Sequence, residues 1–404
     1  MLAPVAKNVS ERTLIGLIGA VQFVNILDFM MVMPLGPDFA VALGIPVSQL
    51  GLVGGVYTAA AAVSGLAGAF FLDRFDRKSA LLVAMAGLVI GTAAGAFATD
   101  LTTLIASRVV AGLFGGPATS VSLSIISDVI PPARRGRAMG SVMGAFSIAS
   151  ILGVPLGLEL ARLGGWRAPF VGVALLGVAV IVIAAFMMPS MRGHIASEKG
   201  RSVGDLTSLF RRPIVILAYA ALGISMMSAF ALIPNISAHV QQNLHYPREK
   251  LGVLYLVGGA VSFVSMRFAG RFVDRVGSFR VNAVGVLAFG AVVYAAFVMA
   301  EPPLPLTVVF AVFMVAQTTR NVALTALISK VPEPHERAGF MSVQSAVQHL
   351  ASALGAGLSS KVFLHDGPNG ALLGMHELAI FSIVLAALTP PIVLAVERRV
   401  RSAP

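Results

Sequence analysis

Long apolar runs separated by short polar turns dominate the pattern of this 404-residue chain. A helix needs roughly 20 residues to cross the hydrocarbon core of a bilayer, and each run has about that length. The runs predict twelve membrane-spanning helices, near residues 13–37, 48–72, 79–98, 102–128, 137–162, 167–189, 213–241, 249–273, 281–300, 305–329, 338–362 and 373–396. The predicted fold class is therefore an all-α membrane protein.

One connection differs from the other short turns. Residues 190–212 are polar and basic, and they contain Gly and Ser. This composition predicts a cytoplasmic linker at 191–212 between two six-helix halves, residues 1–190 and 213–404.

A charged turn that occurs twice, half a chain apart, supports two related halves. The first copy reads A-F-F-L-D-R-F-D-R-K around Asp73, and the second reads G-R-F-V-D-R-V-G-S-F-R around Asp274. A second pair of connections is also similar, I-P-P-A-R-R-G-R-A-M-G-S after the fourth run and V-P-E-P-H-E-R-A-G-F-M-S after the tenth. Internally repeated helical halves are typical of secondary transporters, whose substrate site lies between the halves near the midplane.

Composition narrows the class of protein. Hydrophobic residues make up 57% of the chain and charged residues 12%, which is too apolar for a soluble globular domain. The chain has no cysteine, so disulfides, thiolate metal sites and cysteine nucleophiles are excluded. It also lacks a G-x-x-x-x-G-K-S/T loop for ATP. We expect no enzyme activity, no cofactor and no metal.

The net charge of +11 would suit a nucleic-acid ligand, but its distribution indicates a membrane topology. Most of the 29 Lys and Arg residues lie on one side of the predicted bilayer when both termini are cytoplasmic. We therefore expect a multi-pass protein of the bacterial inner membrane that contacts lipid and does not bind nucleic acid.

These motifs resemble the major facilitator superfamily over nearly the whole chain, with the closest likeness to the drug:proton antiporter branch and its sugar and metabolite efflux relatives. In the first charged turn, Ala69 and Asp76 replace the two glycines of the family pattern. The resemblance implies that this turn latches the halves when the cavity faces outward. Solvated positive-inside residues are the alternative. The predicted latch consists of Asp73, Arg74, Arg77, Lys78, Asp128, Asp274 and Arg275, with Arg77 or Lys78 pairing with Asp128.

The fifth run resembles the antiporter motif of the family. It reads G-A-F-S-I-A-S-I-L-G-V-P-L-G, and the matching residues are Gly144, Gly153, Pro155 and Gly157. Its G-V-P-L-G differs from the usual Gly-Pro arrangement. Small residues here allow close packing and a bend, so a packing role and a coupling role both stay open. A glycine stripe in the third run, Gly87 to Gly95, predicts packing within the bundle in preference to dimerisation, and we expect a monomer.

Ionisable residues inside the predicted spans are the candidates for proton coupling. Asp28 lies roughly 6 Å beyond the midplane at 1.5 Å rise per residue, where burial favours the neutral carboxyl. Arg108, which also matches a family Arg-x-x-x-Gly pattern with Gly112, lies at a similar depth and could stabilise the ionised form. His349 could transfer protons near neutral pH. The alternatives are a structural Asp28 and a hydrogen-bonded packing role for His349.

Polar and adaptable apolar residues in the spans predict a substrate cavity. Arg320 is the candidate contact for an anionic group of the substrate. The full predicted set is Asn25, Met31, Phe146, Met226, Phe230, Gln317, Arg320, Gln344 and Gln348.

The function that the sequence predicts is secondary active transport, in the form of proton-coupled export of a small organic solute or drug by alternating access. Two alternatives stay open. One is proton-coupled or facilitated uptake, since the sequence does not record direction. The other is a receptor or scaffold that has a transporter fold and does not transport.

Overall fold

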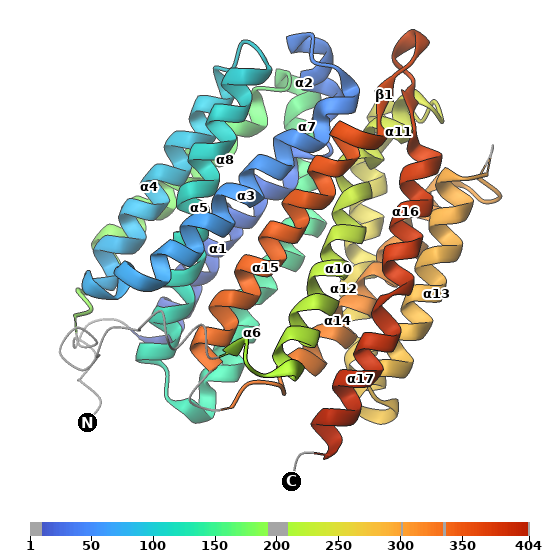
Figure 1. Cartoon of the computed structure of the whole chain (residues 1–404). Coiled ribbons are helices and arrows are strands. Elements are labelled where there is room, and N and C mark those ends of the chain that lie inside the picture. The colour runs from blue at the N-terminus through green and yellow to red at the C-terminus, as the bar shows by residue number, and fades with distance from the viewer. Residues whose placement is uncertain (1–9, 193–208, 300–301, 334–336, 403–404) are drawn as a thin grey trace. The chain divides into compact units, whose positions relative to one another are not determined.

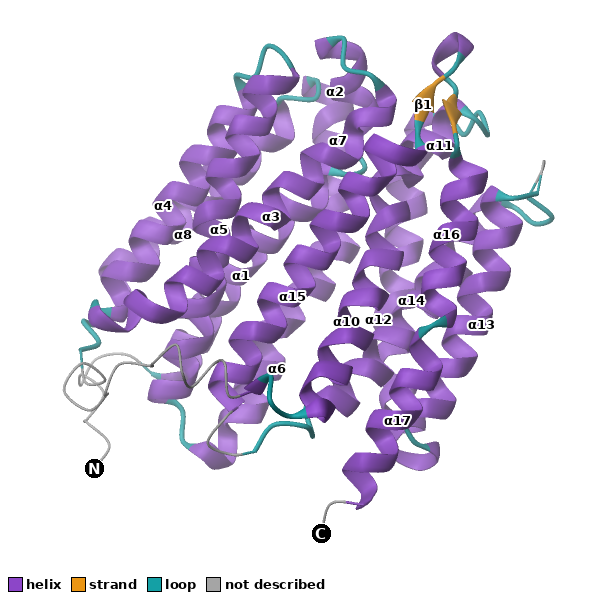
Figure 2. Ribbon diagram, in the orientation of Figure 1, coloured by secondary structure: helices purple, strands orange, loops and turns teal. Residues whose placement is uncertain are grey.

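The computed structural model describes residues 10–192, 209–299, 302–333 and 337–402. These residues are almost entirely helical (Figure 2). The exception is a short antiparallel ribbon in which β1 (His365–Asp366) pairs with β2 (Leu372–Leu373). Helices dominate because a chain in lipid must satisfy its backbone N–H and C=O groups internally.

The order of elements along the chain is drawn in Figure 1. The helices are α1 Glu11–Val32, α2 Gly36–Leu43, α3 Leu50–Phe71, α4 Arg77–Ala96, α5 Leu101–Val129, α6 Pro132–Ile148, α7 Val154–Gly164, α8 Ala168–Met187, α10 Pro213–Leu232, α11 Ile236–Gln242, α12 Leu251–Val276, α13 Ser278–Phe297, α14 Leu306–Ile328, α15 Arg337–Leu358, α16 Met375–Ala387 and α17 Thr389–Ser402. The short helical turns are η1 Val47–Gln49, η2 Leu72–Arg74, η3 Ala149–Gly153, η4 Ile233–Asn235, η5 Arg248–Lys250, η6 Ser359–Phe363 and η7 Pro368–Gly370.

Among the described residues, 11 helical stretches are long and apolar enough to cross a membrane. The helix α15 is also long, at 22 residues, but its sequence contains Gln344, Gln348 and His349 and is correspondingly more polar. Counted with α15, the stretches agree with the twelve predicted spans. The all-α membrane class is confirmed.

The fifth span, in which small residues allow a bend, contains a π-helical turn. α6 passes through η3 into α7, and the N–H of Val154 bonds to the carbonyl of Ala149, five residues earlier. Pro155 follows directly, and because it has no N–H, the regular hydrogen-bond ladder cannot continue through it. A Cβ on Gly153 would lie 2.6 Å from Leu27 of α1, so glycine is needed there for close packing. Within the described part of the chain, a Cβ on Gly144 would meet nothing within 4 Å, and one on Gly157 would make only an ordinary contact, 3.8 Å from Met31.

The glycine stripe of α4 packs inside the helix bundle. A Cβ on Gly91 would lie 2.5 Å from the backbone nitrogen of Ala111 in α5, and one on Gly87 would overlap Phe114. These positions bring α4 and α5 into backbone contact. The predicted packing role of the stripe is therefore seen within this fold.

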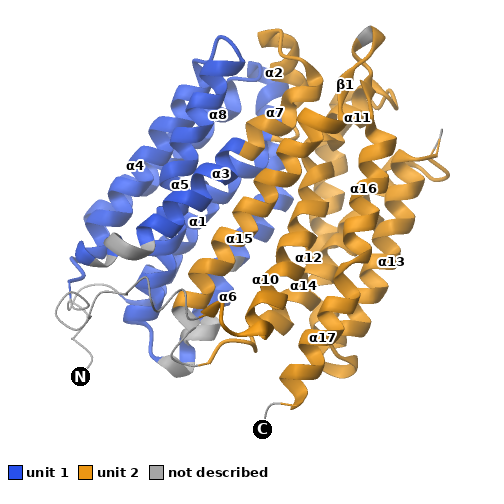
Figure 3. Ribbon diagram, viewed as in Figure 1, with its two compact units in different colours: residues 1–32, 56–202 blue, residues 33–55, 203–404 orange. Residues whose placement is uncertain are grey.

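The chain divides into two compact units (Figure 3). Unit 1 comprises Met1–Val32 and Val56–Ser202, and unit 2 comprises Met33–Gly55 and Val203–Pro404. Unit 2 thus contains a segment from early in the chain, residues 33–55, which includes α2 and the start of α3.

Polar contacts attach this early segment to the rest of unit 2. Arg248 donates to both oxygens of Asp38, with Nε 2.7 Å from Oδ1. The backbone N–H and hydroxyl of Ser48 donate to the two oxygens of Asp366, at 3.1 and 2.8 Å. The loop carrying Asp366 is held between α15 and α16 by η6 and the β1–β2 ribbon.

Candidate functional site

A buried ion pair lies at the centre of unit 1. Asp28 comes from α1 and Arg108 from α5, and their exposed fractions are 0% and 1%. Arg108 Nη1 donates to Asp28 Oδ1 at 3.0 Å and to Oδ2 at 3.2 Å. The structure therefore brings together the two residues that the sequence placed at similar depth. Removing one partner of such a pair leaves an uncompensated buried charge and costs roughly 3–5 kcal/mol.

Thr92 of α4 completes the surroundings of the carboxylate. Its hydroxyl lies 2.7 Å from Asp28 Oδ1 and 2.9 Å from the carbonyl of Leu88 in its own helix. A hydroxyl has one proton and can also accept. It can therefore donate a hydrogen bond to an ionised Asp28, or donate to Leu88 while accepting a hydrogen bond from the O–H of a neutral Asp28.

The Arg108 guanidinium is fixed by further contacts within unit 1. Nη2 donates to the carbonyl of Gly91 at 3.3 Å, which the close approach of α4 and α5 makes possible. The guanidinium carbon lies 5.1 Å from the ring centroid of Phe170 in α8, a distance at which a cation is attracted to an aromatic face. Four helices thus position one charge.

A second polar network joins α1, α3 and α5. Asn25 Nδ2 donates to Thr119 Oγ1 at 2.7 Å and to the carbonyl of Gly115 at 3.0 Å, while Tyr57 donates to Asn25 Oδ1 at 2.8 Å. Thr119 in turn donates to Gln22 Oε1 at 3.3 Å. Asn25 was predicted to line a cavity, and here it is buried and bonded within unit 1.

Sequence reasoning missed Thr92, Tyr57 and Thr119. Hydroxyl residues are common in membrane helices, and nothing in their spacing marks these three. Their partners lie on other helices, 64 residues away for Thr92 and Asp28. Only the packing of α1 with α3, α4 and α5 brings them together with their partners.

The other predicted cavity residues lie in different environments. Met31 and Met226 are buried, Phe146 is exposed, and Phe230 is half-buried. In unit 2, Gln344 is buried, whereas Gln317, Gln348 and His349 are half-buried. Arg320 of α14 is buried, and its Nη2 donates to the carbonyl and hydroxyl of Ser225 in α10 at 3.0 and 3.2 Å.

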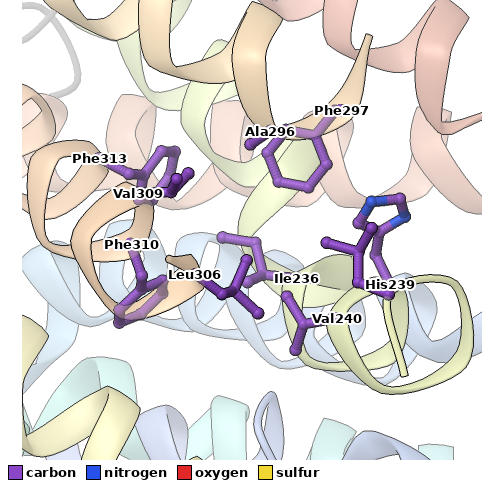
Figure 4. Close-up of a pocket in the computed structure, with 10 residues that line it drawn as sticks. Ile236, His239, Val240, Ala296, Phe297, Leu306, Val309, Phe310 and Phe313 are labelled. Carbon is purple, nitrogen blue, oxygen red and sulfur yellow. The ribbon is translucent and has the colours of Figure 1, made fainter. Parts of the chain in front are cut away.

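A small cavity of about 20 Å³ lies in unit 2, between α11, α13 and α14 (Figure 4). Its walls are apolar apart from His239, whose ring lies 5.0 Å from that of Phe297. None of the residues predicted for the substrate cavity lines it. Its volume is about that of one water molecule, which is too small for an organic solute.

One ion pair forms among the predicted latch residues, between the first turn and α5. Arg77 Nε lies 3.0 Å from Asp128 Oδ2, and the Arg77 side chain is buried while Arg74 is exposed and Lys78 half-buried. The side chain of Asp73 lies outside the described residues. In the second copy, Asp274 and Arg275 are both exposed.

Asp76, which replaces a family glycine, caps α4 and holds the chain that follows α8. It accepts from the N–H of Lys78 at 2.8 Å, from the N–H of Met191 at 3.1 Å, and from the hydroxyl of Ser190. Arg192 lies 3.4 Å away. Burial disfavours the charged carboxyl, but these hydrogen bonds and the Arg192 charge outweigh it and lower the pKa of Asp76. An Asp directly before a helix is a capping signal, so the cap could have been predicted.

Unit 2 caps the corresponding helix from a distant part of the chain. Glu397 of α17 accepts from the N–H of Phe279, near the start of α13, at 2.7 Å.

Among the described residues, no group of three or more His, Asp or Glu side chains could hold a metal ion.

Curated relatives match the chain at modest identity. A probable sugar efflux transporter of Pasteurella multocida (strain Pm70) is 27% identical over 183 residues, 45% of this chain and 44% of the relative. A chloramphenicol resistance protein of Streptomyces lividans is 28% identical over 247 residues, 61% of this chain and 62% of the relative. These matches span less than two thirds of either relative.

A solved structure of a bacterial homologue of the human lysosomal transporter Spinster is similar over nearly the whole chain. The TM-score is 0.74 at 16% identity, with 96% of this chain and 98% of that chain covered, so the likeness is one of fold. The sequence pattern of the Major Facilitator Superfamily matches residues 18–399. The chain therefore belongs to the Major Facilitator Superfamily, a family of multi-pass membrane transporters and not of enzymes.

Proposed function

We propose that the protein is a proton-driven exporter of a small organic solute and that Asp28 is its proton carrier. The buried Asp28–Arg108 ion pair carries this proposal. A carboxylate and a guanidinium removed from water are expensive to keep in a membrane span, and such groups usually mark proton or substrate pathways.

Protonation of Asp28 would change the forces between α1, α4 and α5. Ionised, the carboxylate attracts Arg108 and accepts from Thr92. Neutral, it loses the ionic attraction, and its O–H can donate to Thr92, whose hydroxyl then turns to Leu88. Each step keeps the polar atoms paired, which lowers the cost of moving a proton through an apolar interior.

We propose that this proton transfer is coupled to transport by alternating access. The repeated turns support two halves, 1–190 and 213–404, that rock around a central site. The excess of basic residues in the loops supports cytoplasmic termini and an inner-membrane location. The Arg77–Asp128 pair supports a role of the first turn as a cytoplasmic latch. The name of the sugar efflux relative favours export.

Purified protein in proteoliposomes tests the coupling. We expect a pH gradient to drive uptake of at least one of chloramphenicol, glucose, inosine and benzoate, and solute addition to move protons that a trapped dye reports. In Asp28→Asn both signals should fall at least tenfold, because the amide cannot ionise. The exposed acid Glu377 provides the control Glu377→Gln, which should behave as wild type.

Equal proton movement in wild type and Asp28→Asn would contradict the proposal. If solute transport by the wild type does not depend on the pH gradient, facilitated transport is favoured instead.

A further inference from the structure

Arg320 is a buried cation whose guanidinium is only partly satisfied. The residue is 1% exposed. Nη2 is bonded to Ser225, and the guanidinium carbon lies 4.0 Å from the ring centroid of Phe289. Nε and Nη1 have no hydrogen-bond partner among the described residues. Three of the five guanidinium N–H groups, one on Nε and two on Nη1, therefore remain available.

The contrast with Arg108 is informative. Both arginines are almost fully buried in membrane spans, and each lies against an aromatic ring. Arg108 has its own carboxylate in Asp28, whereas Arg320 forms no ion pair with any described residue. An arginine stays protonated in proteins, and a buried charge without a counter-ion is strongly unfavourable. Such a residue is explained if its counter-ion comes from outside the chain.

Neighbouring polar groups on α14 are also unsatisfied. Gln317 lies three residues before Arg320, so the two are neighbours on the surface of α14. Asn321 follows Arg320 directly and lies four residues after Gln317, so Gln317 is next to both. Gln317 Oε1 and Asn321 Oδ1 are buried without a hydrogen-bond partner in the described part of the chain. This part of α14 thus carries a buried cation and two amides, which are neutral donors and acceptors, with unsatisfied polar atoms on all three side chains.

We propose that Arg320 binds an anionic group of the transported solute, a carboxylate or a phosphate, with Gln317 and Asn321 contacting polar atoms beside it. This inference rests on the proposed transport function and names its substrate class. Phe289 covers one face of the guanidinium, so the anion approaches the edge that carries Nε and Nη1. Guanidinium N–H groups match carboxylate and phosphate oxygens in geometry and charge.

Thermal unfolding of the full chain in detergent, without any proton gradient, tests this binding. The probes are benzoate, lactate and glycerol 3-phosphate, each beside its neutral counterpart benzamide, lactamide or glycerol. We expect at least one anion to raise the Tm of the wild type and its neutral counterpart to leave it unchanged. The shift should vanish in Arg320→Gln and be reduced in Arg320→Lys, since the ammonium keeps the charge and loses the planar donors.

Arg267 of α12 provides the matched control, because it also stacks on an aromatic ring, with 4.5 Å to the centroid of Phe263, but is exposed. Arg267→Gln should keep the anion-induced shift. A shift that persists in Arg320→Gln overturns the proposal, as does a wild type that responds only to the neutral compounds or to none of the probes. If Arg320→Gln does not fold, Arg320→Lys decides: an anion-induced shift equal to that of the wild type overturns the proposal. Binding that survives in Asp28→Asn separates this result from a failure of proton coupling.

Discussion

At the scale of single residues, Asp28 shows how a membrane span can hold a charge. Its carboxylate receives hydrogen bonds from Thr92 and Arg108, and both partners are themselves fixed by a second contact. Arg108 is bonded to the carbonyl of Gly91, and Thr92 is within reach of Leu88. Of the two partners of Asp28, the hydroxyl can both donate and accept while the guanidinium can only donate, so the role of Thr92 can be separated from that of the ion pair.

Thr92→Val removes the hydroxyl and keeps the shape of the side chain. A buried hydrogen bond to a charged group contributes roughly 1.5–3 kcal/mol, so we expect proton-driven transport to fall about tenfold or more. Thr92→Ser should retain most of it. The infrared carbonyl band of protonated Asp28, assigned by its loss in Asp28→Asn, should move to higher wavenumber in Thr92→Val because the carboxyl loses a partner. An unchanged band would show that Thr92 does not touch the carboxyl.

At the scale of elements, the start of α4 joins two parts of unit 1. Asp76 caps this helix and holds residues 190–192, at the end of the last span of the unit. The N–H of Arg77 also donates to the carbonyl of Met191, at 3.2 Å. One carboxylate therefore fixes both a helix start and the beginning of the connection to the next span.

The pH dependence of this anchor follows from the lowered pKa of Asp76. Its contribution to stability is fully present above the ordinary Asp pKa of about 4 and is lost as the pH falls through the lowered folded-state value. We expect Asp76→Asn to lower the Tm at pH 7, where loss of a helix cap costs about 1 kcal/mol. The wild-type and variant Tm values should converge as the pH falls through the lowered folded-state pKa of Asp76.

Asp76→Ser separates the two contacts of this anchor. Serine is a good N-cap but is too short and uncharged to hold both the 190–192 segment and Arg192. We expect an intermediate loss of Tm at pH 7. A pH-independent difference between wild type and Asp76→Asn would assign the effect to packing and not to the ionised carboxyl.

At the scale of the whole molecule, the early segment 33–55 belongs to unit 2, although the chain on either side of it belongs to unit 1. Within unit 2 it is fastened by Arg248 on Asp38, by Ser48 on Asp366 and by Ser237 on the carbonyl of Pro34. If transport requires the halves to rock, this segment must exchange partners during the cycle.

Cross-linking tests whether that exchange is needed. The chain has no native cysteine, so a Ser48→Cys, Asp366→Cys pair can be joined without background reaction. We expect oxidation, or a short thiol cross-linker, to abolish solute transport in proteoliposomes and reduction to restore it. The two single variants should be insensitive to oxidant. Full transport by the cross-linked protein, with cross-linking verified by mass spectrometry, would show that these contacts persist throughout the cycle.

Much of the fold could be predicted because the bilayer restricts the length and composition of each segment along the chain. The length of an apolar run indicates a span, and a carboxylate such as Asp28 inside a run stands out because its burial is costly. The sequence predicts the span of α15 despite its polar residues, and the turn before it is similar to the turn after the fourth run. Depth counting put Arg108 at a depth similar to that of Asp28, because rise per residue in a helix is nearly constant, and the two side chains form an ion pair.

The partners of these charges were decided only by tertiary structure. Arg108 lies 80 residues from Asp28 in the chain and Thr92 lies 64 away, and the rotation of each helix about its axis determines which side chains meet. The repeat predicted similar turns but not that Asp76 caps α4 from within its own turn while Glu397 serves α13 from α17. Sequence sets which segments enter the membrane, because burial of apolar surface acts residue by residue. Helix packing sets which polar groups pair, because a hydrogen bond requires two atoms about 3 Å apart.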